Sequence, residues 1–313
     1  MGRFVLRRLL SMVGVLFAIS VLTFLIFIPS GNPAERIGGR SANAATLMQI
    51  DKQWGFDKPI YVQYINTMKQ IFTGTAYSYT QSVNVDDEIK RALPATLSLA
   101  IGAGIIWLTL GVLFGVLTAV RAGKFTDRTL TVLALIGVSC PPFFIGALIL
   151  YYVGYKANLI PLSGYVPLTQ DPVQWAYHLI APWFTLSILF IGVYSRVLRS
   201  TILDTINEDY VRTAKAKGLS ERRVLFKHTL RNSLIPVISL FGLDFAQVIG
   251  GGAILTETVY NLNGVGQFAF ESTSRLDIPP VLVITMLTAF FVVIFGALVD
   301  ILYAALDPRI RLT

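Results

Sequence analysis

Uncharged stretches constrain the fold of this chain more than any other feature of its sequence. Residues 92–120 and 129–155 contain no charged side chain, and only 14% of the 313 residues are charged. A soluble domain is nearer a quarter charged, and about 20 apolar helical residues suffice to cross a hydrocarbon core about 30 Å thick. The pattern predicts an all-α membrane protein, a single domain over 1–313, with six transmembrane helices. These helices are expected at about 9–28, 94–120, 129–153, 176–195, 233–255 and 280–302.

The first apolar run follows Arg3, Arg7 and Arg8, as the apolar part of a secretory signal follows its basic start. A signal has only about 7–15 apolar residues and ends at a small-x-small cleavage site. Here the run is longer and leads into "FIPSGNPAER", which contains no such site. We therefore expect a retained first span.

Lys and Arg residues are distributed unequally between the loops on alternate sides of the predicted spans. Of the 26 such residues, 17 fall on one side, most of them in 196–232, and nine fall on the other. The positive-inside rule assigns the first set to the cytoplasm. We expect both termini to be cytoplasmic, with an external loop at 29–93 and a large cytoplasmic loop at 196–232. The net charge of +8 is then explained by membrane orientation, without nucleic acid as a partner.

The cytoplasmic loop contains "RTAKAKGLSERRVLFKHTLRN" (212–232) and has its own helical signals. Apolar residues at helical spacing predict a helix over 202–217, which Gly218 ends with a positive φ. Ser220 is placed to cap a second helix that leads into the fifth span. A short Ala-rich helix ending in glycine is typical of a docking element. The alternative is a loop that is basic only because of topology.

Prolines and glycines predict where the spans bend or pack closely. Pro141 with Pro142, and Pro182, are expected to kink the third and fourth spans. Gly111 and Gly115 have the spacing of a helix-packing motif. The glycines at 250–252 permit a break or a close approach at the end of the fifth span. In the external loop, "TLMQIDKQWGFDKPIYVQYINTMKQIF" predicts two short amphipathic helices near the outer surface.

An acid at membrane depth is a candidate functional residue, because its burial is expensive. Asp244 lies in the predicted fifth span, with Gln247 one turn further on. Both are candidates for lining a transport pathway. The alternative interpretation is a structural role for Asp244, as a neutral or paired acid.

The sequence contains no nucleotide-binding or catalytic motif that would make this chain an enzyme. The nearest approach to a phosphate-binding loop, "TAVRAGKF" (118–125), lacks the first glycine and the hydroxyl residue that contacts magnesium. No pattern of Cys and His residues suggests a metal site. A secondary transporter remains an alternative, as does a scaffold or enzyme subunit whose basic loop binds a partner or anionic lipid.

The stretch "DYVRTAKAKGLSERRVLFKHTLRNSLIP" resembles the cytoplasmic EAA loop of permease subunits of ABC importers. The chain departs from the general EAA pattern at Arg212, Thr213, His228 and Arg231. It is similar to the version found in the dipeptide and oligopeptide branch. The stretches "WGFDKPIYVQY", "CPPFFIGALIL", "ETVYNLNGVGQ" and "LDPRIRL" also resemble that branch, so the likeness covers nearly the whole chain.

This resemblance implies a multi-pass protein of a bacterial or archaeal inner membrane that forms half of a pathway for peptides or similar solutes. It implies four partners besides membrane lipid: a second homologous permease, two ATPase chains and an external substrate-binding protein. ATP and magnesium would be bound by the ATPases, with no cofactor on this chain. Peptides, glutathione, metal complexes and sugars all remain open as substrates. The ATPase-docking residues implied are Arg212, Thr213, Ala214, Lys215, Ala216, Lys217, Gly218 and Leu219.

Overall fold

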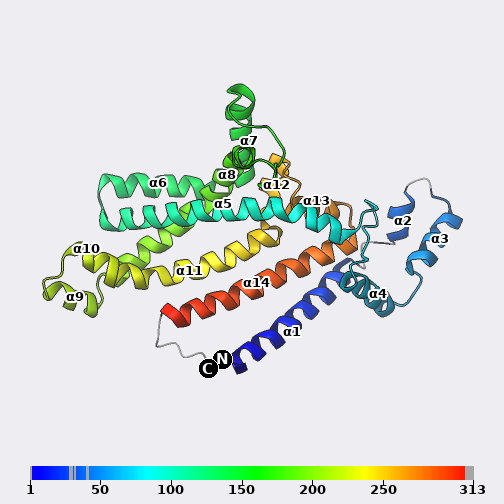
Figure 1. Ribbon diagram of the computed structural model, residues 1–313, viewed down its shortest axis with the longest axis horizontal. Coiled ribbons are helices and arrows are strands. Elements are labelled where there is room, and N and C mark those ends of the chain that lie inside the picture. The colour runs from blue at the N-terminus through cyan, green and yellow to red at the C-terminus, as the bar shows by residue number, and fades with distance from the viewer. Residues whose placement is uncertain (1, 28–30, 32, 40–41, 307–313) are drawn as a thin grey trace.

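The computed structural model describes residues 2–27, 31, 33–39 and 42–306, and helices account for most of them (Figure 1). No β-strand forms among these residues, although one isolated bridge joins Tyr77 to Asn84. Most of the tail "LDPRIRL", with Arg309 and Arg311, lies outside the described residues. The predicted all-α class is confirmed for the part of the chain that is described.

The helices follow one another along the chain, and the longest connections within the described residues are 73–84 and 157–171. The first half contains α1 (Gly2–Phe27), α2 (Pro33–Gly38), α3 (Ala44–Trp54), α4 (Ile60–Phe72), α5 (Val85–Val120), α6 (Phe125–Ser139), α7 (Pro142–Ile149) and the π-helical η2 (Leu150–Lys156). The second half contains α8 (Pro172–Thr205), α9 (Asp209–Ala216), α10 (Glu221–Arg223), η3 (Val224–Thr229), α11 (Leu230–Gln247), η4 (Val248–Gly252), α12 (Ile254–Tyr260), α13 (Val265–Ser274) and α14 (Ile278–Leu306).

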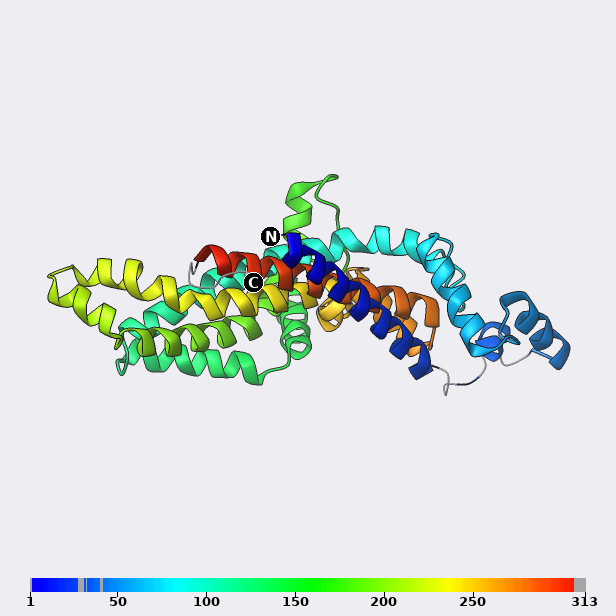
Figure 2. The same ribbon diagram turned by 90° about the horizontal axis from the view of Figure 1, so that it is seen from below.

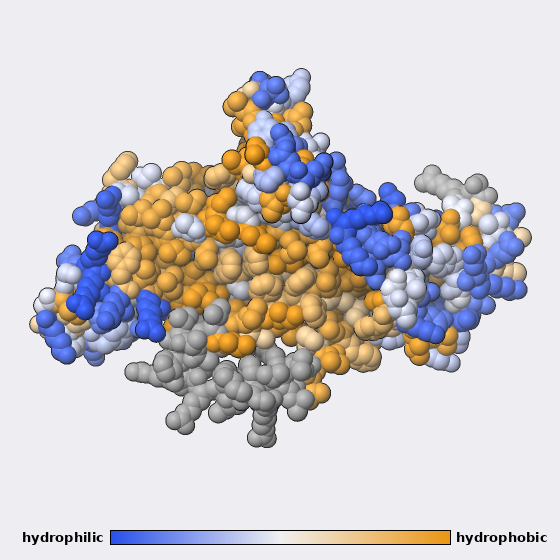
Figure 3. All heavy atoms as spheres, in the orientation of Figure 1, coloured by the Kyte–Doolittle hydropathy of each residue, from blue (hydrophilic) through white to orange (hydrophobic). Residues whose placement is uncertain are grey.

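Five helical segments are long and apolar enough to cross a membrane, and the number is six if the bent pair α6 and α7–η2 counts as one span. Their apolar surface covers the middle of the molecule in Figure 3. Hydrophilic residues gather at its two ends, around α9–α10 and around α2–α4, which lie at opposite ends of the long axis in both ribbon views (Figures 1 and 2). The described structure therefore supports a membrane bundle of five to six spans.

The third predicted span, 129–153, is not one continuous helix. It breaks at Cys140 and Pro141, and α7–η2 leaves α6 at an angle of 98°. Pro141 and Pro142 lack the N–H groups that would continue the helix, so the predicted kink becomes a sharp turn. The α7–η2 arm projects from the side of the bundle (Figures 1 and 2). Pro182, by contrast, lies inside an uninterrupted α8.

The core forms where α5 runs along α8, which is the most extensive helix contact in the described chain. Trp107 is fully buried there and packs against the rings of Phe190 and Phe241. A Cβ on Gly111 would stand 2.8 Å from the Cβ of Tyr194, and one on Gly115 would stand 2.8 Å from the Cβ of Leu198. The predicted role of these two glycines in close helix packing is confirmed.

We expect Gly111→Ala to destabilise the bundle although alanine favours helices. Overpacking costs about 1–3 kcal/mol, against a gain of about 1 kcal/mol in helix propensity. Gly14 of α1 provides a matched control, because nothing lies within 4 Å of a Cβ placed there. Thermal unfolding of the two purified variants should separate them, with Gly111→Ala unfolding at the lower temperature. Equal midpoints would show that α5 and α8 do not pack this closely.

Candidate functional site

The expected helix over 202–217 is divided into two in the structure. Helix α8 ends at Thr205, a turn follows at 206–208, and α9 begins at Asp209. In the turn, the N–H groups of Asn207 and Glu208 bond to carbonyls three residues back, and the Asn207 side chain bonds to Leu203 O (3.0 Å). These bonds compete with the helix. The turn sets α9 against η3, which follows it in the chain, so the loop is a helical hairpin of α9 and α10–η3.

Gly218 ends α9 with φ +77°, which confirms the predicted left-handed turn. Ser220 occupies the position before the next helix, but its side chain makes no capping hydrogen bond. From Glu221 the chain continues helically through α10, η3 and α11 into η4, where Gly251 has a non-helical φ. The second predicted helix therefore leads directly into the fifth span, as expected.

The hairpin has a small apolar core of its own. Val211, Ala214 and Val224 are buried together, and Ile206 and Leu219 pack against them. Ala214 was expected on the docking tip, but it faces this core instead. The amide of Asn232 also donates to the Tyr210 hydroxyl (2.7 Å), which ties α9 to α11. The base of the hairpin is thus held in place by its own contacts.

The remaining predicted docking residues, apart from the partly buried Leu219, lie on the outer surface of the hairpin. We call this surface the hairpin tip; its exposed residues are Arg212, Thr213, Lys215, Ala216, Lys217 and Gly218. A Cβ on Gly218 would meet no atom within 4 Å. Small side chains at 216 and 218 leave the backbone accessible on a hairpin that is otherwise well packed.

The two candidate pathway residues have different surroundings. The buried Tyr194 of α8 donates its hydroxyl proton to Asp244 Oδ2 (2.8 Å), which joins the fifth span to the core. Gln247 is exposed and lines a pocket of about 520 Å³ between α1, η4 and α14. Gly251 also lines this pocket and has φ +108°, so the predicted break at the glycines is present. Asp244 therefore has a structural partner, whereas Gln247 faces open space.

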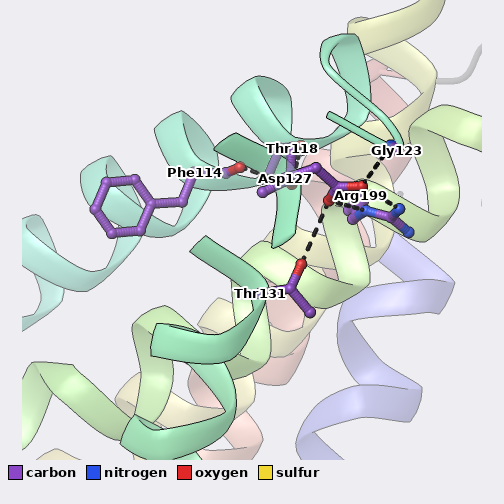
Figure 4. A network of polar contacts seen from close by, with 7 residues as sticks. Phe114, Thr118, Gly123, Asp127, Thr131 and Arg199 are labelled. Carbon is purple, nitrogen blue, oxygen red and sulfur yellow. Dashed lines mark hydrogen bonds and ion pairs between the residues drawn. The ribbon is translucent and has the colours of Figure 1, made fainter. Parts of the chain in front are cut away.

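A buried ion pair connects the start of α6 with the end of α8 (Figure 4). Nε and Nη2 of Arg199 donate to the two carboxylate oxygens of Asp127, each at 2.9 Å. Gly123 N also donates to Oδ2 (2.9 Å) and the Thr131 hydroxyl to Oδ1 (3.3 Å). Asp127 is only 5% exposed. This two-pronged pair holds the 121–124 turn and α6 against α8.

A second buried carboxylate, Glu257 of α12, organises the opposite end of the fifth span. The Thr96 hydroxyl of α5 donates to Oε1 (2.7 Å), and Gln267 N, in the first turn of α13, donates to Oε2 (2.9 Å). A Cβ on Gly264 would stand 2.4 Å from Glu257 Cδ, so glycine is required there. Burial raises the pKa of the Glu257 carboxyl, and these hydrogen bonds oppose that shift. Glu257 thereby fastens α5, α12 and α13 together.

A third buried carboxylate, Asp277, lies at the start of α14 and anchors the long loop before α5. It accepts hydrogen bonds from the Ser78 hydroxyl (2.6 Å), from Tyr79 N (3.0 Å) and from both N and Oγ1 of Thr80 (3.0 and 2.8 Å). Asp277 is fully buried, and Ser78 is buried with it. The contact fixes the end of the α2–α4 region against the bundle.

The sequence analysis did not identify these three carboxylates, although signals for them were present. Asp277 directly precedes an apolar run and Asp127 lies two residues before one, where an unpaired charge would be expensive. Glu257 precedes two closely spaced glycines within "ETVYNLNGVGQ", a pattern that suits a carboxylate held by a tight backbone turn.

The apolar helical bundle, with a basic helical hairpin at one end, is the architecture of a multi-span membrane protein. The chain belongs to the family of binding-protein-dependent transport system inner membrane components, whose pattern matches residues 111–312. The N-terminal region of such membrane components matches residues 1–100. The chain is therefore a multi-pass, non-enzymatic permease subunit of the inner membrane.

Curated relatives match along the full length of the chain. A probable peptide ABC transporter permease protein, y4tP, from Sinorhizobium fredii is 36% identical over 99% of this chain and 100% of its own. The glutathione transport system permease protein GsiC from Salmonella choleraesuis is 34% identical over 99% of each chain. Among solved structures, a chain of the inward-facing MetNI methionine ABC transporter superposes with a TM-score of 0.53 at 16% identity. That match covers 70% of this chain and 96% of the other, and it shows a shared fold.

Proposed function

We propose that this chain is one of two transmembrane subunits of an ATP-driven importer, and that it forms half of the pathway for short peptides or similar small solutes. Family membership and full-length relatives named as peptide and glutathione permeases support this function. The two names differ in substrate but agree on a small peptide-like solute. A binding assay with the cognate binding protein and a panel of di- to pentapeptides and glutathione tests the substrate class.

We propose that the α9–α10 end faces the cytoplasm and the α2–α4 end faces outward. The excess of Lys and Arg in 196–232 supports this orientation. Two ATPase chains would carry ATP and magnesium, and one of them would dock at the cytoplasmic end of this chain. The external binding protein would meet the α2–α4 end, and Gln247, beside its pocket, would line the pathway. Asp244 we assign to bundle packing, because of its bond from Tyr194.

The observation that carries this proposal is the hairpin over 204–232. Its base is buried and hydrogen-bonded, while Ala216 and Gly218 are exposed at its tip. A short, well-packed element with small outward side chains can enter a groove and transmit displacement to the fifth span, with which it is continuous. Lys215, Lys217, Arg222 and Arg223 would steer the encounter and set its register. A loop that is basic only for topology would need no packed hairpin.

We expect Ala216→Trp to lower ATP-driven uptake by at least about tenfold, because the indole would prevent close approach at a central contact. Ala157→Trp is a matched control, since Ala157 is also exposed but lies directly after η2, outside the hairpin. Uptake in reconstituted vesicles and co-purification of the ATPases give the two readouts. Wild-type uptake by Ala216→Trp, with the ATPases still bound, would refute the docking role.

A further inference from the structure

A groove lies between the last turn of α5 and the base of the hairpin. We call it the inner groove; it has a volume of about 430 Å³, and its walls include Ala119, Val120, Lys215, Glu221, Arg222 and Phe226. Val120 is the last residue of a membrane-spanning helix. The inner groove therefore opens at the depth where the apolar body of the bundle meets its charged end.

The charged residues of the inner groove leave it with an excess of one positive charge. Lys215 and Arg222 are both exposed cations, and Glu221 is the acid beside them. Among the described residues, none of these three side chains takes part in an ion pair. A ligand with one negative charge would neutralise the groove.

The apolar part of the inner groove is equally accessible. Val120 is 58% exposed and Phe226 is 55% exposed, and both lie in the same groove as the two cations. A soluble phosphate ion would satisfy the cations and leave these side chains in water. A molecule with a single phosphodiester and an acyl chain would satisfy both halves.

We propose that the inner groove binds one monoanionic phospholipid of the cytoplasmic leaflet, with its phosphodiester on Lys215 and Arg222 and its acyl chain along Val120 and Phe226. The proposal rests on the orientation given under Proposed function. The cytoplasmic leaflet supplies anionic lipids, and each basic residue near such a surface contributes about 1 kcal/mol. A lipid in this position would lie against the base of the hairpin, and Ala216 is not among the residues that line the groove.

The test measures lipid retention by the purified full-length chain without ATPases. The chain is placed in nanodiscs of phosphatidylcholine containing phosphatidylglycerol and then extracted, and the bound lipids are counted by mass spectrometry. We expect preferential retention of phosphatidylglycerol by the wild-type chain. Lys215→Gln with Arg222→Gln should weaken that retention by about thirty-fold. Arg223→Gln with Lys227→Gln makes the same charge change on exposed residues outside the groove and should retain the lipid.

A second variant tests the apolar half of the groove. Val120→Asn keeps every charge, so it should lose phosphatidylglycerol if the acyl chain lies on Val120, whereas a site for free phosphate would be unaffected. Equal retention by the groove and control variants, displacement of the lipid by inorganic phosphate, or retention by Val120→Asn would each overturn the proposal. Displacement by added ATPase would identify the groove as a protein interface instead. Because the measurement needs no ATPase, its outcome is independent of the Ala216→Trp test.

Discussion

Glu257→Ala is expected to destabilise the purified protein by about 3–5 kcal/mol, because the substitution leaves two donors without an acceptor and opens a void. The Thr96 hydroxyl and Gln267 N both lose their partner on Glu257. The removed side chain also leaves a void where it was fully buried. Thermal unfolding in detergent should show a large fall in midpoint, with loss of monodisperse protein during size-exclusion chromatography.

Two further variants test whether the loss comes from the hydrogen bonds of Glu257 or from any substitution at this position. Glu257→Gln has nearly the same shape; its oxygen can accept from Gln267 N while its amide faces Thr96, so the loss should be about 1 kcal/mol. Gly264→Ala places a Cβ 2.4 Å from Glu257 Cδ and should be destabilising alone. Combined with Glu257→Ala it should cost less than the sum of the single changes. Strict additivity would show that Gly264 and Glu257 are not in contact.

Arg199→Met is expected to destabilise the α6–α8 contact by about 2 kcal/mol, because it leaves the buried carboxylate of Asp127 without its cation. The value lies below the 3–5 kcal/mol of a fully buried pair, since about a third (32%) of the Arg199 side chain is exposed. Chemical or thermal unfolding of the purified chain measures it.

A double-mutant cycle provides the control for this ion pair. Asp127→Asn keeps an acceptor for Gly123 N and removes the charge that Arg199→Met would strand. The double variant should therefore be more stable than Arg199→Met alone. A double variant at least as unstable as the sum of its parts would mean that the pair in Figure 4 contributes no net attraction.

Of the two turns in the hairpin, the sequence pattern predicted one and missed the other. The glycine at position 218 predicted the end of α9 in a left-handed turn, because only a residue without a Cβ adopts φ +77° at little cost. The turn at 206–208 was not predicted, since the helix-forming pattern over 202–217 continues through it. That turn reorients α9 so that Val211 and Ala214 are buried against Val224, which follows them by more than two helical turns.

The third span likewise has one feature that the sequence predicted and one that it did not. Pro141 and Pro142 predicted a bend, because neither can donate the hydrogen bond that the helix needs. The angle of 98° could not be predicted from them, because it depends on the packing of α7 against α8 and α12. A missing N–H interrupts a helix but does not determine the direction in which the next helix runs.

The sequence by itself determined the membrane class and the helix breaks at Gly218 and Pro141, because apolar length and backbone constraints are local properties. Tertiary structure alone decided which polar groups meet: Asp127 pairs with Arg199 across 72 residues, and Glu257 with Thr96 across 161. It also decided that Asp244 faces Tyr194 while Gln247 faces a pocket. A buried carboxylate must find donors wherever the packed helices bring them, and sequence spacing carries no record of which helices become neighbours.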